Sequence, residues 1–203
     1  PAHLPNGHIV PALLAGNAVV FKPSELTPAS GAYMAGLWAE AGLPEGVLMV
    51  TQGRADTGRA LAAHPELDGL LFTGSARTGI ALNRAFAEKP EKILALEMGG
   101  NNPIIVWDSP DLASAAVLGV QSAFISAGQR CTAARRLIVD QRLFDPLMKE
   151  ISKLLDRVIV GEPHANPQPF MGPVIDNQAA DGLTESFLYF LSNGGRAIKH
   201  LVR

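Results

Sequence analysis

The residue of this sequence best suited to covalent chemistry is Cys131, the only cysteine among 203 residues. It lies in a polar stretch that begins with glycine, residues 128–132 (GQRCT), whereas a cysteine kept for packing usually lies in an apolar run. A cysteine reacts as its thiolate, which nearby positive charge stabilises. Arg130, Arg135 and Arg136 are candidates for that charge. Cys131 is therefore a candidate nucleophile, and the alternative is a small buried apolar residue.

An isolated acid, Glu97, is the candidate base. It lies in residues 96–100 (LEMGG), between an apolar run and two glycines. A partly buried carboxylate at this place could accept a proton near neutral pH, and a thiol with a nearby base supports covalent catalysis. Seen alone, Glu97 could equally cap a loop. Five histidines are present, but they lack metal-ligand spacing with Cys131, so the sequence predicts no metal site.

Two segments at predicted strand ends have the residue types that bind a dinucleotide. Lys22 and Glu25 could hold the two hydroxyls of an adenosine ribose, and the Glu25 carboxylate would repel a 2′-phosphate, which favours NAD over NADP. Residues 74–79 (GSARTG), with Ser75 and Gly79, lead into a helix whose first N–H groups suit a phosphate. They do not form the G-x-G-x-x-G fingerprint. A solvated loop pair and an ordinary strand–helix turn are the alternative explanations of the two segments.

The first half of the chain alternates short apolar strands with amphipathic helices. This order predicts an α/β fold with a Rossmann-like, doubly wound parallel sheet that is covered on both faces. Ligands of such sheets bind beyond the carboxyl ends of the strands, where Lys22, Ser75 and Glu97 fall. The predicted strands are residues 17–21, 47–50, 69–72 and 93–96, and the predicted helices are 6–15 (broken near Pro11), 28–42, 54–63 and 77–88.

The pattern restarts after Gly100, which predicts a second domain. We expect residues 1–99 to be a portion of an NAD-binding domain and residues 100–203 to be part of an α/β catalytic domain that carries the nucleophile. The second half predicts strands at 103–107 and 137–139, helices at 111–126, 142–157 and 176–193, and a loop rich in proline and glycine at 161–173.

The composition excludes several kinds of partner. Hydrophobic residues make up 47% of the chain, charged residues 18%, and the net charge is -2. Because no basic patch is present, we expect no nucleic-acid partner, and no apolar run approaches the roughly 20 residues of a membrane span. A single cysteine cannot form an internal disulfide, which favours a reducing, cytoplasmic location. The chain begins with Pro1 rather than Met, so we expect it to be a piece of a longer protein.

Taken together, the segments resemble the aldehyde dehydrogenase superfamily, and they occur in the order typical of that family over essentially the whole chain. The step of 34 residues from Glu97 to Cys131 also fits. Within the superfamily, four further phrases resemble most closely a bacterial semialdehyde dehydrogenase of arginine breakdown. The superfamily phrases are residues 4–7 (LPNG), 21–25 (FKPSE), 41–44 (AGLP), 72–75 (FTGS), 96–101 (LEMGGN), 128–131 (GQRC) and 170–175 (FMGPVI). The four closer phrases are 97–103 (EMGGNNP), 121–124 (QSAF), 127–132 (AGQRCT) and 168–170 (QPF).

This resemblance implies a fold, a reaction and a set of site residues. It implies the aldehyde dehydrogenase fold, with Cys131 attacking a small-molecule aldehyde, NAD accepting a hydride, and Glu97 activating the water that releases a carboxylate. The Cys131 backbone N–H would be one donor to the oxyanion. The cofactor positions that the resemblance implies are Lys22 and Glu25 on the ribose, Ser75 on the pyrophosphate with Gly79 in the same turn, Gly42 and Pro44 on the adenine side, and Gly99 close to the nicotinamide.

The resemblance also shows departures. The oxyanion-hole asparagine, the oligomerisation hairpin and a Glu-x-Phe cofactor contact of the family have no counterpart in residues 1–203. Because loss of one oxyanion donor typically costs about 100- to 1000-fold in rate, we expect little activity from this chain alone. We expect the full-length protein to be a homo-oligomer. The alternatives are a semialdehyde dehydrogenase that transfers the acyl group to CoA, and a catalytically silent module that keeps the nucleotide fold.

Overall fold

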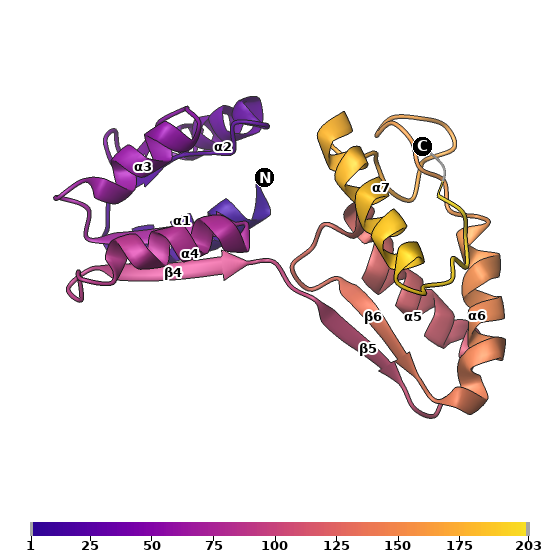
Figure 1. Ribbon diagram of the computed structural model, residues 1–203. Helices are drawn as coiled ribbons and strands as arrows, with labels where there is room; N and C mark the ends of the chain where they lie inside the picture. Colours follow the sequence, from indigo (N-terminus) through magenta and orange to yellow (C-terminus); the bar gives the residue numbers. More distant parts are fainter. Residues whose placement is uncertain (1, 202–203) are drawn as a thin grey trace. The chain divides into compact units, whose positions relative to one another are not determined.

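The computed structural model describes residues 2–201, which fall into two compact units that divide between Met98 and Gly99 (Figure 1). The division falls one residue before the boundary predicted from the sequence. Each unit has its own strands and helices and is described by itself.

The first unit alternates helices and strands along its whole length, as predicted. Its strands pair in parallel, β1 with β2 and β3 with β4, so the described residues of this unit form two two-stranded sheets rather than one continuous sheet. The elements are α1 (His3–Leu14), β1 (Val19–Phe21), α2 (Pro28–Glu40), β2 (Leu48–Val50), α3 (Ala55–Ala63), β3 (Gly69–Gly74), α4 (Ala76–Phe86) and β4 (Ile93–Met98).

The β1–β2 sheet buries one face against α1 and α2. Phe21 of β1, Ile9 of α1 and Met34 of α2 are buried together in one cluster. The intervening strand residues Val20 and Met49 are exposed, as alternation along a strand requires. One face of this sheet is therefore covered by the two helices, and α1 is held in a fixed place beside β1.

The β3–β4 sheet presents its two faces to different surroundings. Gly79 of α4 lies against the Met98 side chain, so the face that includes Met98 is the face that α4 covers. Thr73 and Glu97 pair in register and are each one residue from that face, so their side chains lie on the opposite face. This arrangement places Glu97 away from α4.

The second unit is built on one parallel pair, β5 with β6. Helices α5 and α6 pack on this pair around a buried cluster of Val106, Ala116, Val120, Leu147 and Ile151. Aspartates cap the helices: the Asp111 carboxylate accepts the Ser114 N–H at 3.0 Å, and the Asp176 carboxylate accepts the Ala179 N–H at 2.8 Å. The elements are β5 (Asn102–Val106), α5 (Leu112–Phe124), the short 3₁₀ segment η1 (Ile125–Gly128), β6 (Ala134–Val139), α6 (Gln141–Leu155) and α7 (Asn177–Ser192).

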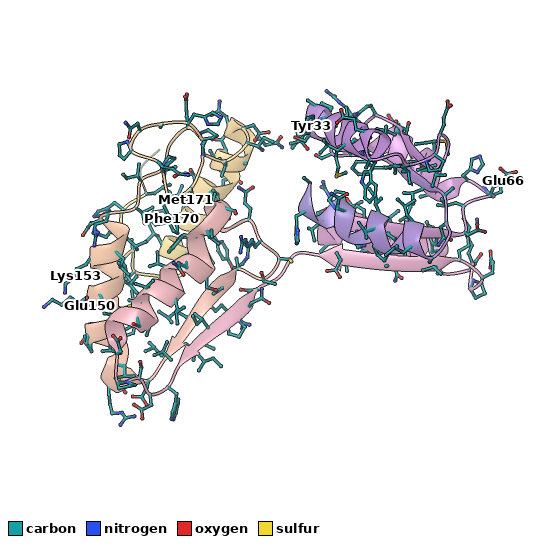
Figure 2. All side chains as sticks on the ribbon, turned by 180° about the vertical axis from the view of Figure 1, so that it is seen from behind. Tyr33, Glu66, Glu150, Lys153, Phe170 and Met171 are labelled. Carbon is teal, nitrogen blue, oxygen red and sulfur yellow. The ribbon has the colours of Figure 1, made fainter. Side chains whose placement is uncertain are left out.

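The outer face of α6 is polar. Lys153 donates to Glu150 one turn away at 2.6 Å, and both side chains point outward from the helix (Figure 2). The opposite stripe carries Leu147 and Ile151 into the core. This amphipathic pattern is why residues 142–157 predicted a helix, and α6 follows that prediction within two residues.

Two predicted elements were wrong in detail. Helix α1 runs from His3 to Leu14 through Pro11 without the predicted break. A proline leaves the carbonyl four residues earlier without its partner, and here that carbonyl belongs to the exposed Gly7, which solvent can reach. Strand β4 does not end before Glu97, because Thr73 and Gly74 of β3 continue the pairing through Met98.

Candidate active site

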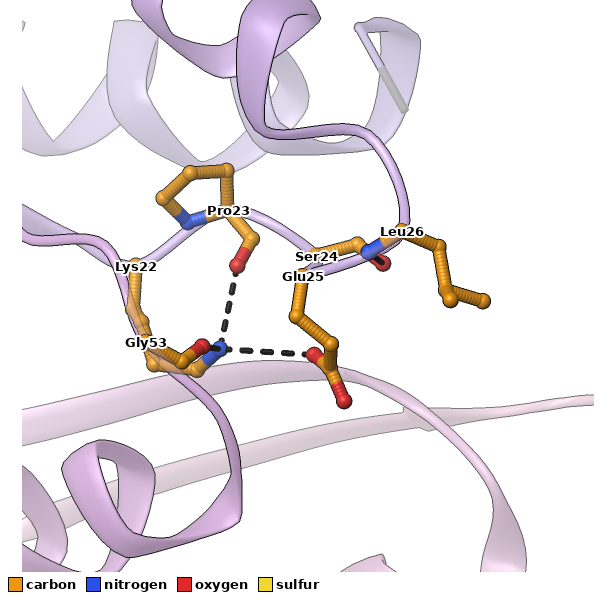
Figure 3. Close-up of polar contacts among 6 residues, drawn as sticks. All are labelled: Lys22, Pro23, Ser24, Glu25, Leu26 and Gly53. Carbon is orange, nitrogen blue, oxygen red and sulfur yellow. Dashed lines mark hydrogen bonds and ion pairs between the residues drawn. The ribbon is translucent and has the colours of Figure 1, made fainter.

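Lys22 and Glu25 come together at the carboxyl end of β1 (Figure 3). The Lys22 ammonium donates to the carbonyl oxygens of Gly53 at 2.8 Å and Pro23 at 3.0 Å, and it lies 3.7 Å from the Glu25 carboxylate. The Lys22 side chain is 20% exposed and that of Glu25 is 47% exposed. The lysine is therefore held by two carbonyls from different loops, while the Glu25 carboxylate points to solvent and can accept hydroxyl groups.

Gly42 and Pro44 lie in the connection from α2 to β2. Gly42 has a φ of +88°, and the Leu43 N–H donates to the Trp38 carbonyl at 3.1 Å, which is the hydrogen bond that closes a helix end. The positive φ explains glycine at this position by itself. A role of Gly42 and Pro44 beside an adenine stays a prediction.

Ser75 is the N-cap of α4. Its hydroxyl oxygen accepts the Thr78 N–H at 3.2 Å, and α4 begins at Ala76 with N–H groups available for an anion. Gly79, one turn further, is buried against Met98, and a Cβ there would overlap the methionine side chain. Close helix–strand packing thus accounts for Gly79, and its predicted contact with a cofactor stays a prediction.

Glu97 is exposed, whereas the sequence suggested a partly buried carboxylate. Its register partner Thr73 forms a hydrogen bond with His8 of α1, and the His8 Nε2 and Thr73 Oγ1 atoms are 3.2 Å apart. His8 therefore reaches the face of the β3–β4 sheet on which Glu97 lies. No local sequence pattern predicts this contact, because the two residues are 65 positions apart.

Cys131 carries a free, exposed thiol on the loop between η1 and β6. The backbone before it is unusual, because Ser126 and Ala127 have φ values of 56° and 54° and Gly128 has 68°. Left-handed backbone is costly for residues other than glycine, so two such residues in succession mark strain next to the candidate nucleophile. Residue types at 126 and 127 gave no signal of this turn.

The arginines around Cys131 make contacts with backbone carbonyls. The Arg136 guanidinium donates to the Asn101 carbonyl at 3.0 Å, and that of Arg135 donates to the Gly128 carbonyl at 3.4 Å. Arg130 is exposed beside Cys131. Two of the three predicted positive groups therefore bind the backbone around the loop, and Arg130 faces solvent.

The predicted site residues fall in both units. Glu97 and the residues predicted to bind the ribose and pyrophosphate belong to the first unit, whereas Gly99 and Cys131 belong to the second. Within residues 2–201, no cluster of three or more His, Cys, Asp or Glu side chains could hold a metal ion. None of the helices in that same range is long and apolar enough to cross a membrane.

Residues 1–198 match the sequence model of the aldehyde dehydrogenase family, and the chain belongs to that family. A relative from Sphingopyxis alaskensis, named N-succinylglutamate 5-semialdehyde dehydrogenase, is 66% identical over 203 residues. The alignment covers 100% of this chain and 42% of the relative, so the chain spans about two fifths of that protein's length.

Solved structures show the same fold. An E. coli structure described as an NADP dependent enzyme is 35% identical with a TM-score of 0.91, over 97% of this chain and 40% of that one. The NAD-dependent aldehyde dehydrogenase from Sinorhizobium meliloti is 32% identical with a TM-score of 0.83, over 91% of this chain and 37% of that one. The family resemblance and the α/β fold class predicted from the sequence are confirmed.

Proposed function

We propose that this chain contributes the nucleophile, the base and most of the cofactor contacts of an NAD-dependent aldehyde dehydrogenase. The observation that carries the proposal is the exposed, free thiol of Cys131, the only cysteine of a chain that belongs to this family. A thiol kept for packing would be buried. Cys131 instead lies on a loop that a strained turn precedes, which is typical of functional positions.

The proposed reaction has two covalent stages. The Cys131 thiolate attacks the aldehyde carbon, a C–S bond forms, and the carbonyl oxygen becomes an alkoxide that the Cys131 N–H stabilises. A bound NAD would supply the oxidising chemistry of this stage: the hydride would leave this carbon for the cofactor, and the alkoxide would re-form its C=O bond to leave a thioester on Cys131. Glu97 then takes a proton from water as the water oxygen attacks the thioester. The C–S bond breaks, its electrons return to the Cys131 sulfur, and a carboxylate is released.

The residues of the first unit fit a dinucleotide. The Lys22 and Glu25 pair offers one donor group and one acceptor group to vicinal hydroxyls, and the start of α4 at Ser75 offers N–H groups to a pyrophosphate. The Glu25 carboxylate would oppose a 2′-phosphate, which supports NAD over NADP. Relatives of this fold are described with either cofactor, so the proposed preference for NAD over NADP depends on Glu25.

We propose N-succinylglutamate 5-semialdehyde as the aldehyde and N-succinylglutamate as the product. The support is the 66% identity to the Sphingopyxis alaskensis relative of that name. The molecule carries carboxylates, and the exposed Arg130 next to Cys131 is a cation that one of them could contact.

A hybrid enzyme tests the proposal, in which residues 1–203 replace the matching segment of the Sphingopyxis alaskensis relative. With N-succinylglutamate 5-semialdehyde and NAD, we expect the hybrid to form N-succinylglutamate. Replacing Cys131→Ala should abolish acid formation and leave NAD binding intact. Replacing Glu97→Gln should keep a rapid burst of one NADH per site and slow the steady state about a hundredfold, since only the hydrolytic stage needs the base.

Other outcomes would contradict the proposal. Oxidation that persists in the Cys131→Ala variant would exclude Cys131 as the nucleophile. Formation of acyl-CoA instead of acid would indicate the CoA-acylating alternative. Binding of NAD without any oxidation, in a hybrid whose Cys131 remains reactive toward iodoacetamide, would indicate the silent nucleotide-binding module.

A further inference from the structure

Asn102 holds the loop that carries Cys131. It is the first residue of β5, and its side-chain nitrogen donates to two backbone carbonyls, that of Cys131 at 2.6 Å and that of Ala133 at 3.2 Å. The Asn102 side chain is partly buried, and Ala133 is only 2% exposed. One amide group therefore fixes the carbonyl of the candidate nucleophile itself and the carbonyl two residues later.

The strand pairing explains why a side chain is needed here. Asn102 pairs with Ala134, but the next residue, Pro103, pairs with Arg136, so Arg135 is an extra residue in β6. Such a bulge interrupts the regular pairing and bends the strand, and bulges are common beside active sites. Because β5 begins at Asn102, its partner Ala134 is the first residue of β6 that pairs with β5, and the residues just before Ala134 have no such pairing. The Asn102 side chain provides hydrogen bonds where the sheet does not.

Gly100 brings the backbone close to the same carbonyl. A Cβ at Gly100 would lie 2.5 Å from the Cys131 carbonyl oxygen and 2.8 Å from the Asn102 side-chain nitrogen. The approach is possible only without a side chain. On the other side of the nucleophile, the Gln129 N–H donates to the Ser126 carbonyl at 3.1 Å. The loop is thus held both before and after Cys131.

We infer that Asn102 is a positioning residue for Cys131, and this inference rests on the proposed function. Fixing the Cys131 carbonyl restricts the backbone rotation within that residue and so limits the directions of its thiol and of its N–H. Both groups must point at one reacting carbon within a few tenths of an ångström for covalent attack and oxyanion stabilisation. Asn102 acts through the backbone of Cys131 and needs no contact with the substrate.

The amide is the group that this geometry requires. An NH₂ group has two hydrogens, which match two carbonyl acceptors, and a carboxylate of the same shape has none. An aspartate at position 102 would place negative charge against both carbonyl oxygens. Asn101, the preceding residue, is exposed, and its side chain forms no hydrogen bond with any residue from 2 to 201, so it is a matched control.

The test compares Asn102→Asp, Asn102→Ala and the control Asn101→Ala in the hybrid enzyme. We expect both Asn102 variants to slow the NADH burst about ten- to a hundredfold, since two hydrogen bonds are lost. The dissociation constant of NAD should stay within about twofold, because Asn102 acts on the nucleophile and not on the cofactor. Asn101→Ala should match the parent enzyme in both quantities. An unchanged burst rate in Asn102→Asp, or an equal weakening of NAD binding, would overturn the inference.

A second measurement keeps the inference testable if the proposed function fails. Retention of acid formation by a Cys131→Ser variant would contradict the proposed function alone. Hydrogen exchange at residues 129–134 reports the loop directly and needs no activity. We expect Asn102→Ala to raise this exchange about tenfold and Asn101→Ala to leave it unchanged. Equal protection in the two variants would show that Asn102 does not hold the loop.

Discussion

Two adjacent glycines provide a sharp test of the contacts around Cys131. A methyl group added at Gly100 would meet the Cys131 carbonyl oxygen at 2.5 Å, whereas a methyl group at Gly99 would meet no atom within 4 Å. Neither glycine has a positive φ, so alanine is compatible with both backbones. The substitutions Gly100→Ala and Gly99→Ala therefore differ in the contact, and neither requires a left-handed backbone from alanine.

The cost of Gly100→Ala follows from this contact. The 2.5 Å separation is about 1 Å shorter than the ~3.5 Å at which non-bonded atoms attract. The carbonyl must move, and overpacking of this kind costs about 1–3 kcal/mol. The Asn102 side chain would move as well, which weakens hydrogen bonds worth about 1 kcal/mol each. We expect the free energy of unfolding of the second unit to fall by roughly 2–4 kcal/mol. Gly99→Ala should change it by less than about 1 kcal/mol, in the stabilising direction.

Thermal unfolding followed by circular dichroism measures the difference, and hydrogen exchange assigns it to a unit. A loss of about 1 kcal/mol lowers Tm by roughly 2–4 °C in a chain of this size, so we expect Gly100→Ala to melt roughly 4–16 °C below the parent. Exchange should rise in β5, β6 and the Cys131 loop and stay unchanged in the first unit. Equal Tm values for the two variants would refute the reasoning, because they would show that Gly100 does not lie against Cys131.

Four further predictions concern other parts of the chain. Gly31→Ala should lower the free energy of unfolding of the first unit by about 1–3 kcal/mol, because a Cβ on this buried glycine would overlap Pro23; urea unfolding measures it, and an unchanged midpoint would count against the contact. Glu25→Ala in the hybrid enzyme should tighten NADP binding about tenfold, because a carboxylate near a 2′-phosphate is removed. Titration with both cofactors measures this, and an unchanged ratio of the NAD and NADP dissociation constants would exclude a role of Glu25 in choosing the cofactor. Hydrogen bonds from the Arg142 side chain and backbone lower the folded-state pKa of Asp140, so as the pH falls below about 4 the unfolded chain binds this proton first and the contribution to stability is lost through the folded pKa. Urea unfolding should show that Asp140→Asn reduces the loss of stability over this acidic range. An unaltered dependence of stability on pH would contradict the prediction. The two-stranded sheets leave strand edges open within residues 2–201, so sedimentation should show self-association that grows with concentration, and a monodisperse monomer would refute it.

Local sequence patterns predicted most of the secondary structure. Within residues 2–201, apolar runs and amphipathic periods anticipated each strand and α-helix within a few residues, because these patterns depend on neighbours in the chain, but they did not predict the 3₁₀ segment η1. Gly42 marked the end of α2, since its φ of +88° suits glycine. The exceptions have physical reasons: the carbonyl that Pro11 leaves unpaired belongs to an exposed residue, and β4 continues past Leu96 because the more distant strand β3 supplies partners.

The candidate site was only partly visible in the sequence. Cys131 and Glu97 stood out by residue type and setting, and Lys22 by its place after a strand. The environment of Glu97 was predicted wrongly, because exposure depends on what packs over a strand. The contact between His8 and Thr73 joins residues 65 positions apart, and no periodicity reports on such a distance.

The sequence by itself determined the family, the order of the elements and the identity of the candidate nucleophile, because motifs and periodicity depend only on which residue types follow one another along the chain. Only the tertiary structure decided how that nucleophile is held. The hydrogen bonds from the Asn102 side chain to the Cys131 loop depend on the register of β5 against β6 and on the bulge at Arg135. Register and bulges follow from contacts between distant segments, which a short window of sequence does not contain.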